Sequence, residues 1–342
     1  MTRVTIAVPT FKRFEYLPAT LAAVEKQDYP ELELIVSDNG QNGPELEDLV
    51  RRYYTGPFVF RRNERTVNIT EHYNQLVGAA SGDYFVLLCD DDEISANFVS
   101  DLAARLDARP QAAVAIARQE IVDGAGAVLR RSVAELPPAL TGEDFIAAWC
   151  DGRYRFECFV TNMARTELVR ACGGYPRFGR GTHCDDALLT KLAVGREVLL
   201  SGESVFRWRV DGLSHGWTIR IEDLAADTRQ FLHFLGSDAW LRAAARRDPA
   251  AWARARHELV SMTFKTYYWR WCTLYRERLP WRRWVRAAFD VPFNYRYYRR
   301  VLRVLAAEVK SWVAGRVRTV VRGGPGRGAV PGSSRSGAGD PR

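Results

Sequence analysis

The first third of the chain alternates between two kinds of hydrophobic pattern. Short runs rich in β-branched and aromatic residues, which favour strands, are separated by segments in which apolar residues recur at helical spacing. Strands are expected at residues 4–8, 32–37, 58–62 and 84–89, and helices at residues 15–26, 45–54, 70–80 and 97–108. Strict alternation of strand and helix predicts βαβ units, and therefore an α/β fold with a mostly parallel sheet flanked by helices.

The rest of the chain shows weaker alternation and ends in a segment of different composition. Residues 112–122 and 127–133 predict a β-hairpin, and helical stretches then surround a loop rich in glycine and arginine at residues 173–183. Helical patterns dominate from residue 219, whereas residues 323–342 are rich in Gly, Pro and Ser and contain few apolar residues. We expect an α/β domain over residues 1–218, a helical C-terminal extension over residues 219–322 and a disordered tail over residues 323–342.

Composition narrows the class of protein. With 47% hydrophobic and 26% charged residues, the chain has the balance of a folded globular protein. No run approaches the roughly 18 apolar residues of a membrane-spanning helix, and the first residues lack the layout of a secretory signal, so a cytoplasmic location is expected.

The six cysteines form no Cys-x-x-Cys pair and are predicted to be free, mostly buried thiols. Zinc-hydrolase, G-x-S-x-G and P-loop motifs are absent from the sequence.

Three consecutive aspartates follow the apolar run that ends near residue 89. Ligands of parallel α/β sheets bind beyond the carboxyl ends of the strands, so Asp90, Asp91 and Asp92 are expected at a binding edge. Neighbouring carboxylates repel one another and favour a cation, and hard oxygen ligands suit Mg²⁺ or Mn²⁺ shared with substrate phosphates. The alternative is a solvated acidic turn that caps the next helix.

Three longer segments, in their order and spacing, resemble the inverting family 2 glycosyltransferases. They are VTIAVPTFKRFEYLPATLAAVEKQDYPELELIVSDNG, NITEHYNQLVGAASGDYFVLLCDDD and GGYPRFGRGTHCDDALLTKLAVG. The resemblance covers roughly residues 3–215 and implies a GT-A fold, with a nucleotide-sugar-binding half over residues 1–115 and an acceptor or catalytic half over residues 116–218. It also implies a nucleotide-diphosphate-sugar donor, a divalent metal and a hydroxyl acceptor: a polysaccharide, a lipid-linked glycan of the cell envelope or a small glycoside.

The same resemblance implies roles for individual residues. Asp38 would accept a hydrogen bond from the base, Asp91 would approach the ribose, and Asp92 would ligate the metal within a DXD-type motif. Family members usually show Asn-x-Gly before the helix that carries Asn74, and this chain departs from that pattern at residues 68–70. The donor-binding positions carried over are Pro9, Thr10, Arg13, Asp38, Asn74, Asp90 and Asp91.

A second acidic pair, Asp185-Asp186, opens a predicted helix after the glycine-rich loop. Two adjacent desolvated carboxylates cannot both ionise without cost, so one is expected to have a raised pKa suited to accepting a proton. The resemblance implies that Asp186 is the catalytic base, with Asp185 as the alternative, while an acidic helix cap would explain the pair without any function. His215 lies where relatives place a residue near the diphosphate or the metal, and a purely structural histidine is its alternative.

The basic charge of the chain is concentrated in its C-terminal third. Residues 246–322 contain 19 Lys or Arg and 5 Asp or Glu, against a formal net charge of +8 for the whole chain. Apolar residues at 298, 301, 302, 305, 309, 312 and 313 predict an amphipathic helix that could rest peripherally on the inner face of the cell membrane. The alternatives are packing on the catalytic domain or in a dimer, and a non-catalytic basic module that binds anionic lipid or nucleic acid. Nucleic acid is the less expected partner because no known nucleic-acid motif accompanies the charge.

Overall fold

The computed structural model describes residues 2–212 and 218–322, and the side chains of these as far as residue 310. Contacts divide the chain into two units, Met1–Pro292 and Phe293–Arg342, which are described separately. His215 and the predicted tail over residues 323–342 lie outside the described residues. The domain boundary expected at residue 218 stays a prediction.

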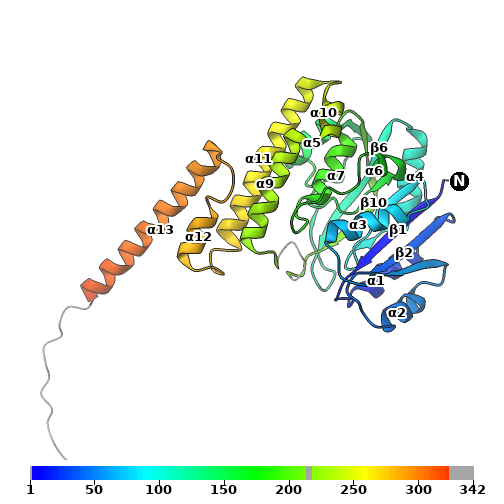
Figure 1. Cartoon of the computed structure of the whole chain (residues 1–342), viewed down its shortest axis with the longest axis horizontal. Helices are drawn as coiled ribbons and strands as arrows, with labels where there is room; N and C mark the ends of the chain where they lie inside the picture. Colours follow the sequence, from blue (N-terminus) through cyan, green and yellow to red (C-terminus); the bar gives the residue numbers. More distant parts are fainter. Residues whose placement is uncertain (1, 213–217, 323–342) are drawn as a thin grey trace, which may run out of the picture. The chain divides into compact units, whose positions relative to one another are not determined.

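Within the described part of the first unit, a single ten-stranded sheet carries the fold (Figure 1). The strands are β1 (Val4–Thr10), β2 (Leu32–Asp38), β3 (Phe58–Arg62), β4 (Tyr84–Leu87), β5 (Glu93–Ile94), β6 (Ala112–Val122), β7 (Val128–Arg131), β8 (Ala139–Thr141), β9 (Met163–Arg165) and β10 (Glu197–Arg209). The helices are α1 (Leu17–Glu25), α2 (Glu45–Tyr53), α3 (Ile69–Ala79), α4 (Phe98–Ala108), α5 (Gly142–Cys150), α6 (Thr166–Ala171), α7 (Cys184–Ala193), α9 (Ile221–Ser237), α10 (Ala239–Ala245), α11 (Pro249–Thr273) and α12 (Trp281–Ala287).

The sheet has a parallel half and a mixed half. The strand order is β3-β2-β1-β4-β9-β6-β10-β5, and the first four strands are all parallel. Strand β9 is antiparallel to both β4 and β6, while β6 and β10 run parallel to each other. The α/β fold and the predicted βαβ units are confirmed, and the predicted hairpin is the β6–β7 pair. As a consequence, the carboxyl ends of β1, β2 and β4 meet at one edge.

Helices cover both faces of the sheet because side chains alternate along each strand. On β1, Ile6 and Val8 pack in the core formed with α1, α2 and α4, whereas Ala7 packs in the core formed with α3, α5 and α7. Phe231 of α9 and Leu259 of α11 are buried in this second core. Helices α9 and α11 therefore pack on the sheet domain, and they lie side by side (Figure 1).

The second unit contains a single long helix among its described residues, α13 (Tyr295–Arg322), of 28 residues. The helix predicted from the amphipathic spacing is thus present. Leu302 and Val309 are 58% and 51% exposed. Throughout the described ranges, no helix is both long enough and apolar enough to cross a bilayer.

Candidate active site

The predicted donor-binding residues of the first two βαβ units lie together at the carboxyl edge of the sheet. Thr10, the last residue of β1, is paired in register with Asp38, the last residue of β2. Thr10 is buried, and its hydroxyl donates to the carbonyl of Ser37 at 3.2 Å. Pro9 is buried beside it. The two strand ends form a fixed platform for the segments that follow them.

The Asp38 carboxylate is fully buried and held on both of its oxygens. Its Oδ1 accepts from the Gly40 amide at 2.8 Å and from Asn42 Nδ2 at 2.9 Å, and its Oδ2 accepts from Arg62 Nε at 3.0 Å. Arg62 ends β3 and was not singled out from the sequence. An ion pair of this kind compensates a charge that would be costly to bury alone. The predicted contact of Asp38 with the base stays a prediction.

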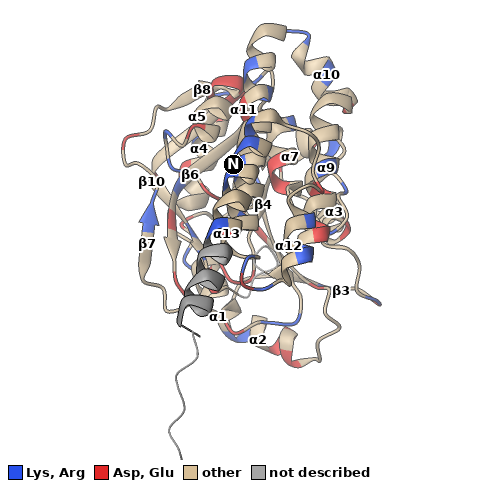
Figure 2. Ribbon diagram, turned by 90° about the vertical axis from the view of Figure 1, so that its left-hand side faces the viewer, with Lys and Arg blue, Asp and Glu red and all other residues tan. Residues whose placement is uncertain are grey.

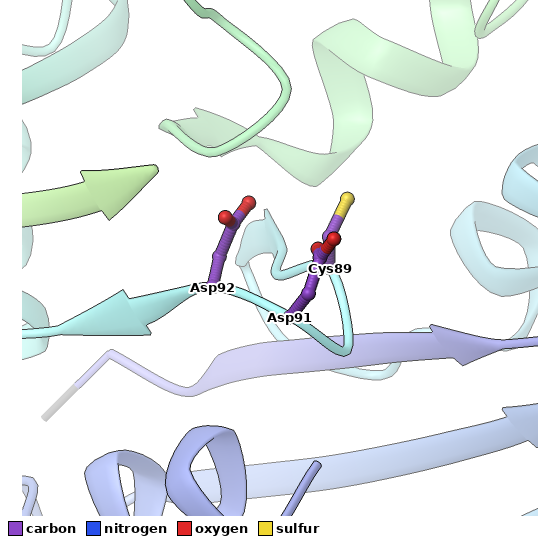
Figure 3. Close-up of side chains that lie close together, drawn as sticks. All are labelled: Cys89, Asp91 and Asp92. Carbon is purple, nitrogen blue, oxygen red and sulfur yellow. The ribbon is translucent and has the colours of Figure 1, made fainter. Parts of the chain in front are cut away.

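The acidic motif after β4 forms a compact cluster that includes a cysteine. Donor atoms of Cys89, Asp91 and Asp92 all lie within 4.8 Å of one another, and the three side chains rise from the same side of the loop (Figure 3). Asp92 is 1% exposed, and its Oδ1 accepts from the backbone N–H of Arg209 at 2.9 Å. Its backbone carbonyl accepts from Thr20 Oγ1 at 2.8 Å. Asp92 is therefore locked in position between α1 and β10.

Burial and mutual repulsion make it costly for all three aspartates of this motif to be ionised. Burial raises the pKa of Asp90, Asp91 and Asp92, and in Asp90 and Asp92 the repulsion from Asp91 adds to this rise. Burial and the three carboxylates also raise the pKa of the Cys89 thiol, so Cys89 stays neutral. Two hard carboxylate donors beside a neutral thiol fit Mg²⁺ or Mn²⁺ better than a soft metal.

Two arginines border the acidic cluster. Arg13 Nη2 lies 2.8 Å from Asp211 Oδ2 and 3.9 Å from Asp91 Oδ2, while its Nη1 is buried with no hydrogen-bond partner. Arg209 is buried at the end of β10, where its Nε donates to the Asp91 carbonyl at 2.9 Å and its Nη2 pairs with Glu93. A buried guanidinium nitrogen with no acceptor is a donor suited to an anionic ligand.

The second acidic pair lies in the first turn of α7, as predicted (red in Figure 2). His183, in the left-handed region at φ 69°, precedes this turn, and its Nδ1 lies 3.2 Å from Asp186 Oδ2. The His183 ring stacks on Phe231 at 4.9 Å between ring centroids. Burial and the neighbouring Asp186 raise the pKa of Asp185 to about 7. The two carboxylates thus differ: Asp186 is oriented by a histidine, and Asp185 exchanges its proton near neutral pH.

Helix α9 holds the loop that leads into α7. Asp227 is fully buried and accepts from the backbone N–H of Arg180 at 3.1 Å and of Thr182 at 2.9 Å. Gln230 accepts from the Gly179 N–H at 3.1 Å, and Thr228 Oγ1 lies 3.4 Å from His183 Nε2. The position of the acidic pair therefore depends on a helix that follows the predicted catalytic domain in the sequence.

Asn74 ties α3 to the glycine-rich loop. Its Nδ2 donates to the Tyr175 carbonyl at 2.9 Å, and its Oδ1 accepts from the Tyr175 N–H at 2.8 Å. Gly174 makes this close approach feasible, because it adopts a φ of +68° and a Cβ there would lie 2.2 Å from Asn74 Oδ1. Both Nδ2 and Oδ1 of Asn74 therefore take part in this contact. The predicted contact of Asn74 with the donor stays a prediction.

Cys158 lies within electrostatic reach of both acidic clusters. Burial raises the pKa of its thiol, and the charges of Asp185 and Asp92 raise it further. All six cysteines of the chain are free, as expected from their spacing. Strands β1, β2, β4 and β10 and helix α7 therefore bring together a buried carboxylate cluster, an unpartnered arginine nitrogen and a second carboxylate pair.

Comparison with known proteins identifies the family. Residues 5–172 match the model of glycosyl transferase family 2. This part of the chain belongs to glycosyl transferase family 2. Abequosyltransferase RfbV of Salmonella typhimurium is 27% identical over 110 residues, which are 31% of this chain and 33% of that protein. The chain thus spans about a third of the length of this curated relative.

Solved structures show that the family 2 chain has the GT-A fold. S. aureus TarS 1–349 in complex with UDP-GlcNAc has a TM-score of 0.62 and 18% identity, and the match covers 85% of this chain and 82% of that one. The mannosyltransferase PcManGT from Pyrobaculum calidifontis, in complex with GDP-Man and Mn²⁺, has a TM-score of 0.53 and 18% identity, with 93% and 82% coverage. The prediction of a family 2 glycosyltransferase with this fold is confirmed.

Proposed function

We propose that this protein is a metal-dependent, inverting glycosyltransferase that moves a sugar from a nucleotide diphosphate to a hydroxyl acceptor. The observation that carries this proposal is the presence of two carboxylate pairs, Asp91-Asp92 and Asp185-Asp186, that both lie within electrostatic reach of Cys158. The similar structures hold UDP-GlcNAc, or GDP-Man with Mn²⁺, which supports a nucleotide-sugar donor. The likeness to abequosyltransferase RfbV supports the transfer of a sugar.

The nucleotide-sugar donor would bind at the carboxyl edge of the sheet. Asp38, fixed by Arg62, faces the end of the site formed by β1 and β2, where the base of the nucleotide would lie. The unpartnered Nη1 of Arg13 would donate to a phosphate oxygen. Asp92 is the expected ligand of a divalent ion, with Asp91 near enough to share it. A bound ion of this type offsets the charge that develops on the leaving diphosphate.

The acidic pair supplies the proton acceptor for the attacking hydroxyl. Contact with His183 orients the Asp186 carboxylate, so Asp186 accepts the proton as the acceptor oxygen attacks. Asp185, with a pKa of about 7, holds a proton for part of the time and would contact a hydroxyl of the bound sugar or acceptor. Attack opposite the leaving diphosphate inverts the anomeric centre. A positioned base contributes about 10² to 10⁴ in rate.

Calorimetric titration of the full chain with UDP and GDP, in the presence and absence of Mn²⁺, tests this function. We expect one nucleotide to bind at least about tenfold more tightly with Mn²⁺, because Asp91 and Asp92 repel a diphosphate unless a cation lies between them. A thermal-shift screen across nucleotide sugars then identifies the sugar. Binding that no metal strengthens, for any nucleotide, would instead favour a non-catalytic basic module.

We also propose that the protein contacts an anionic membrane surface through its C-terminal helices. On α12, Trp281 is 50% exposed and Phe289, just after the helix, is 44% exposed, while Arg282 and Arg286 are exposed and Trp284 is buried. Aromatic rings favour the boundary between head groups and acyl chains, and arginines pair with lipid phosphates. In the second unit, α13 adds further arginines and the exposed Leu302.

Sedimentation with vesicles tests this contact. The full chain should sediment with vesicles that contain phosphatidylserine or phosphatidylglycerol but not with neutral vesicles, and 1 M salt should release it because the Debye length falls to about 3 Å. The double variant Trp281→Gln/Phe289→Gln should bind more weakly, whereas Tyr53→Gln, on the exposed face of α2, should bind like the wild type. Equal sedimentation with neutral and anionic vesicles would contradict the electrostatic part of the proposal.

A further inference from the structure

A cavity lined by arginines and carboxylates opens at the edge of the sheet opposite the two acidic clusters. It has a volume of about 910 Å³ and lies where β6 and β10 begin and where α5 and α11 start. Strands β6 and β10 run parallel to β4, because β9 is antiparallel to both β4 and β6. Their amino ends therefore lie away from the edge that carries Asp38 and Asp92, and the cavity is separate from the proposed donor site.

Two neighbouring arginines line this cavity. Arg196 stacks on the Trp240 ring at 5.1 Å, and its Nη1 is buried with no hydrogen-bond partner among the described residues. Burial lowers the pKa of Arg196, and the neighbouring charge of Arg247 lowers it further. Arg247 donates from Nη1 to the Gly195 carbonyl at 3.1 Å. In the part of the chain that the structure describes, neither guanidinium forms an ion pair with a carboxylate.

Five carboxylates line the same cavity, and three of them accept hydrogen bonds from nearby N–H or O–H groups. Glu143 Oε1 accepts from the Gly195 N–H at 2.9 Å, and Asp144 Oδ2 accepts from Thr141 Oγ1 at 2.8 Å. Asp248 Oδ1 accepts from the Ala251 N–H at 2.8 Å and caps α11. Glu197 lies 3.5 Å from Arg109. Among the described residues, none of the five carboxylates forms an ion pair with Arg196 or Arg247.

We propose that Arg196 and Arg247 form a binding site for a phosphate group, distinct from the donor site. A dianion would stabilise the neighbouring positive charges of Arg196 and Arg247 and could accept a hydrogen bond from the unused N–H of Arg196. Guanidinium groups bind phosphate well because their paired N–H donors match two phosphate oxygens. Arg254, exposed on the first turns of α11, lines the same cavity. The cavity is far larger than a phosphate ion, so it also has room for the organic part of a phosphomonoester.

Isothermal titration of the full chain with inorganic phosphate, without divalent metal, tests the site. We expect one saturable site, and we expect Arg196→Met and Arg247→Met each to weaken it about tenfold or more, as the loss of a charge-assisted hydrogen bond does. The control Arg52→Met, which removes one exposed charge from α2, should leave phosphate affinity unchanged. Glycerol 3-phosphate serves as the second ligand: tighter binding than phosphate assigns the site to a phosphomonoester, and equal binding assigns it to the free anion.

Two results would overturn the proposal: no saturable phosphate binding by the wild type, or binding that both arginine variants retain in full. Retained binding would place the phosphate elsewhere, for example at Arg13. Thermal unfolding of each variant shows whether it is folded. If Arg196→Met does not fold, Arg247→Met decides alone, because Arg247 lies on the surface and its replacement removes no buried packing. The result is independent of the proposed transferase activity, since neither the nucleotide sugar nor a metal is present.

Discussion

Replacement of Asp186 by asparagine should lower kcat for sugar transfer by about 10² or more, with little change in nucleotide-diphosphate affinity. Asparagine keeps the shape of the side chain and its contact with His183, but it cannot accept a proton at neutral pH. The proposed donor contacts lie on β1, β2 and the loop after β4, so they are unaffected. Steady-state kinetics with the identified nucleotide sugar measures kcat, and calorimetry with the nucleotide diphosphate measures affinity.

Asp185→Asn is the matched control for this experiment. It changes the same type of side chain in the same helical turn, but the hydrogen bond with His183 is made by Asp186, and burial and the neighbouring Asp186 raise the pKa of Asp185 to about 7. Its effect on kcat should therefore be milder. A reversed order of severity would identify Asp185 as the base, and equal mild effects would show that neither carboxylate accepts the proton.

Much of the parallel half of the sheet and the β6–β7 hairpin could be predicted from the sequence, whereas the short strands of the mixed half could not. Residues 58–62 were predicted as a strand with the bounds that β3 has, and β1 extends the predicted strand by only two residues. Strands β5, β8 and β9 have two or three residues each, too few to show any period. Their pairing depends on β4, β6 and β10, which are distant in the sequence, so tertiary contacts determine it.

The candidate site shows the same division between local and distant signals. Both acidic clusters could be recognised, because adjacent carboxylates after a strand or at a helix start are visible in the sequence alone. The groups that hold them could not: Arg209 binds Asp92 from 117 positions away, and Asp227 binds the loop at Arg180 from 47 positions away. Cys89 was expected to be only a buried thiol, although its sulfur lies among the carboxylates.

Asp227 shows why the extent of a family match does not define the extent of a site. The match ends at residue 172, before the acidic pair of α7, and α9 follows later still. Nevertheless α9 supplies the carboxylate that accepts two N–H groups of the loop, and Phe231 on which His183 stacks. The helical region after residue 218 is therefore part of the machinery that positions the proposed base.

Asp92→Asn should abolish the strengthening of nucleotide-diphosphate binding by Mn²⁺ and reduce transfer to the background rate. Asp92 is buried and accepts from the Arg209 N–H, so alanine would leave a buried donor unpaired, whereas the asparagine Oδ1 can still accept this bond. The loss of one carboxylate leaves Asp91 as the only charged donor among the three clustered side chains. A single carboxylate binds a divalent cation weakly without further protein ligands.

Calorimetry with and without Mn²⁺ measures this effect, and thermal unfolding without metal shows whether the fold survives. We expect the metal-free unfolding temperature to be unchanged or higher, because the substitution also removes repulsion between Asp92 and the neighbouring Asp91 and Asp90. Asp48→Asn on the exposed face of α2 removes a charge remote from the cluster and should bind the nucleotide and Mn²⁺ like the wild type. Full Mn²⁺ enhancement in a folded Asp92→Asn variant would show that the cation, if one is used, is held by other groups.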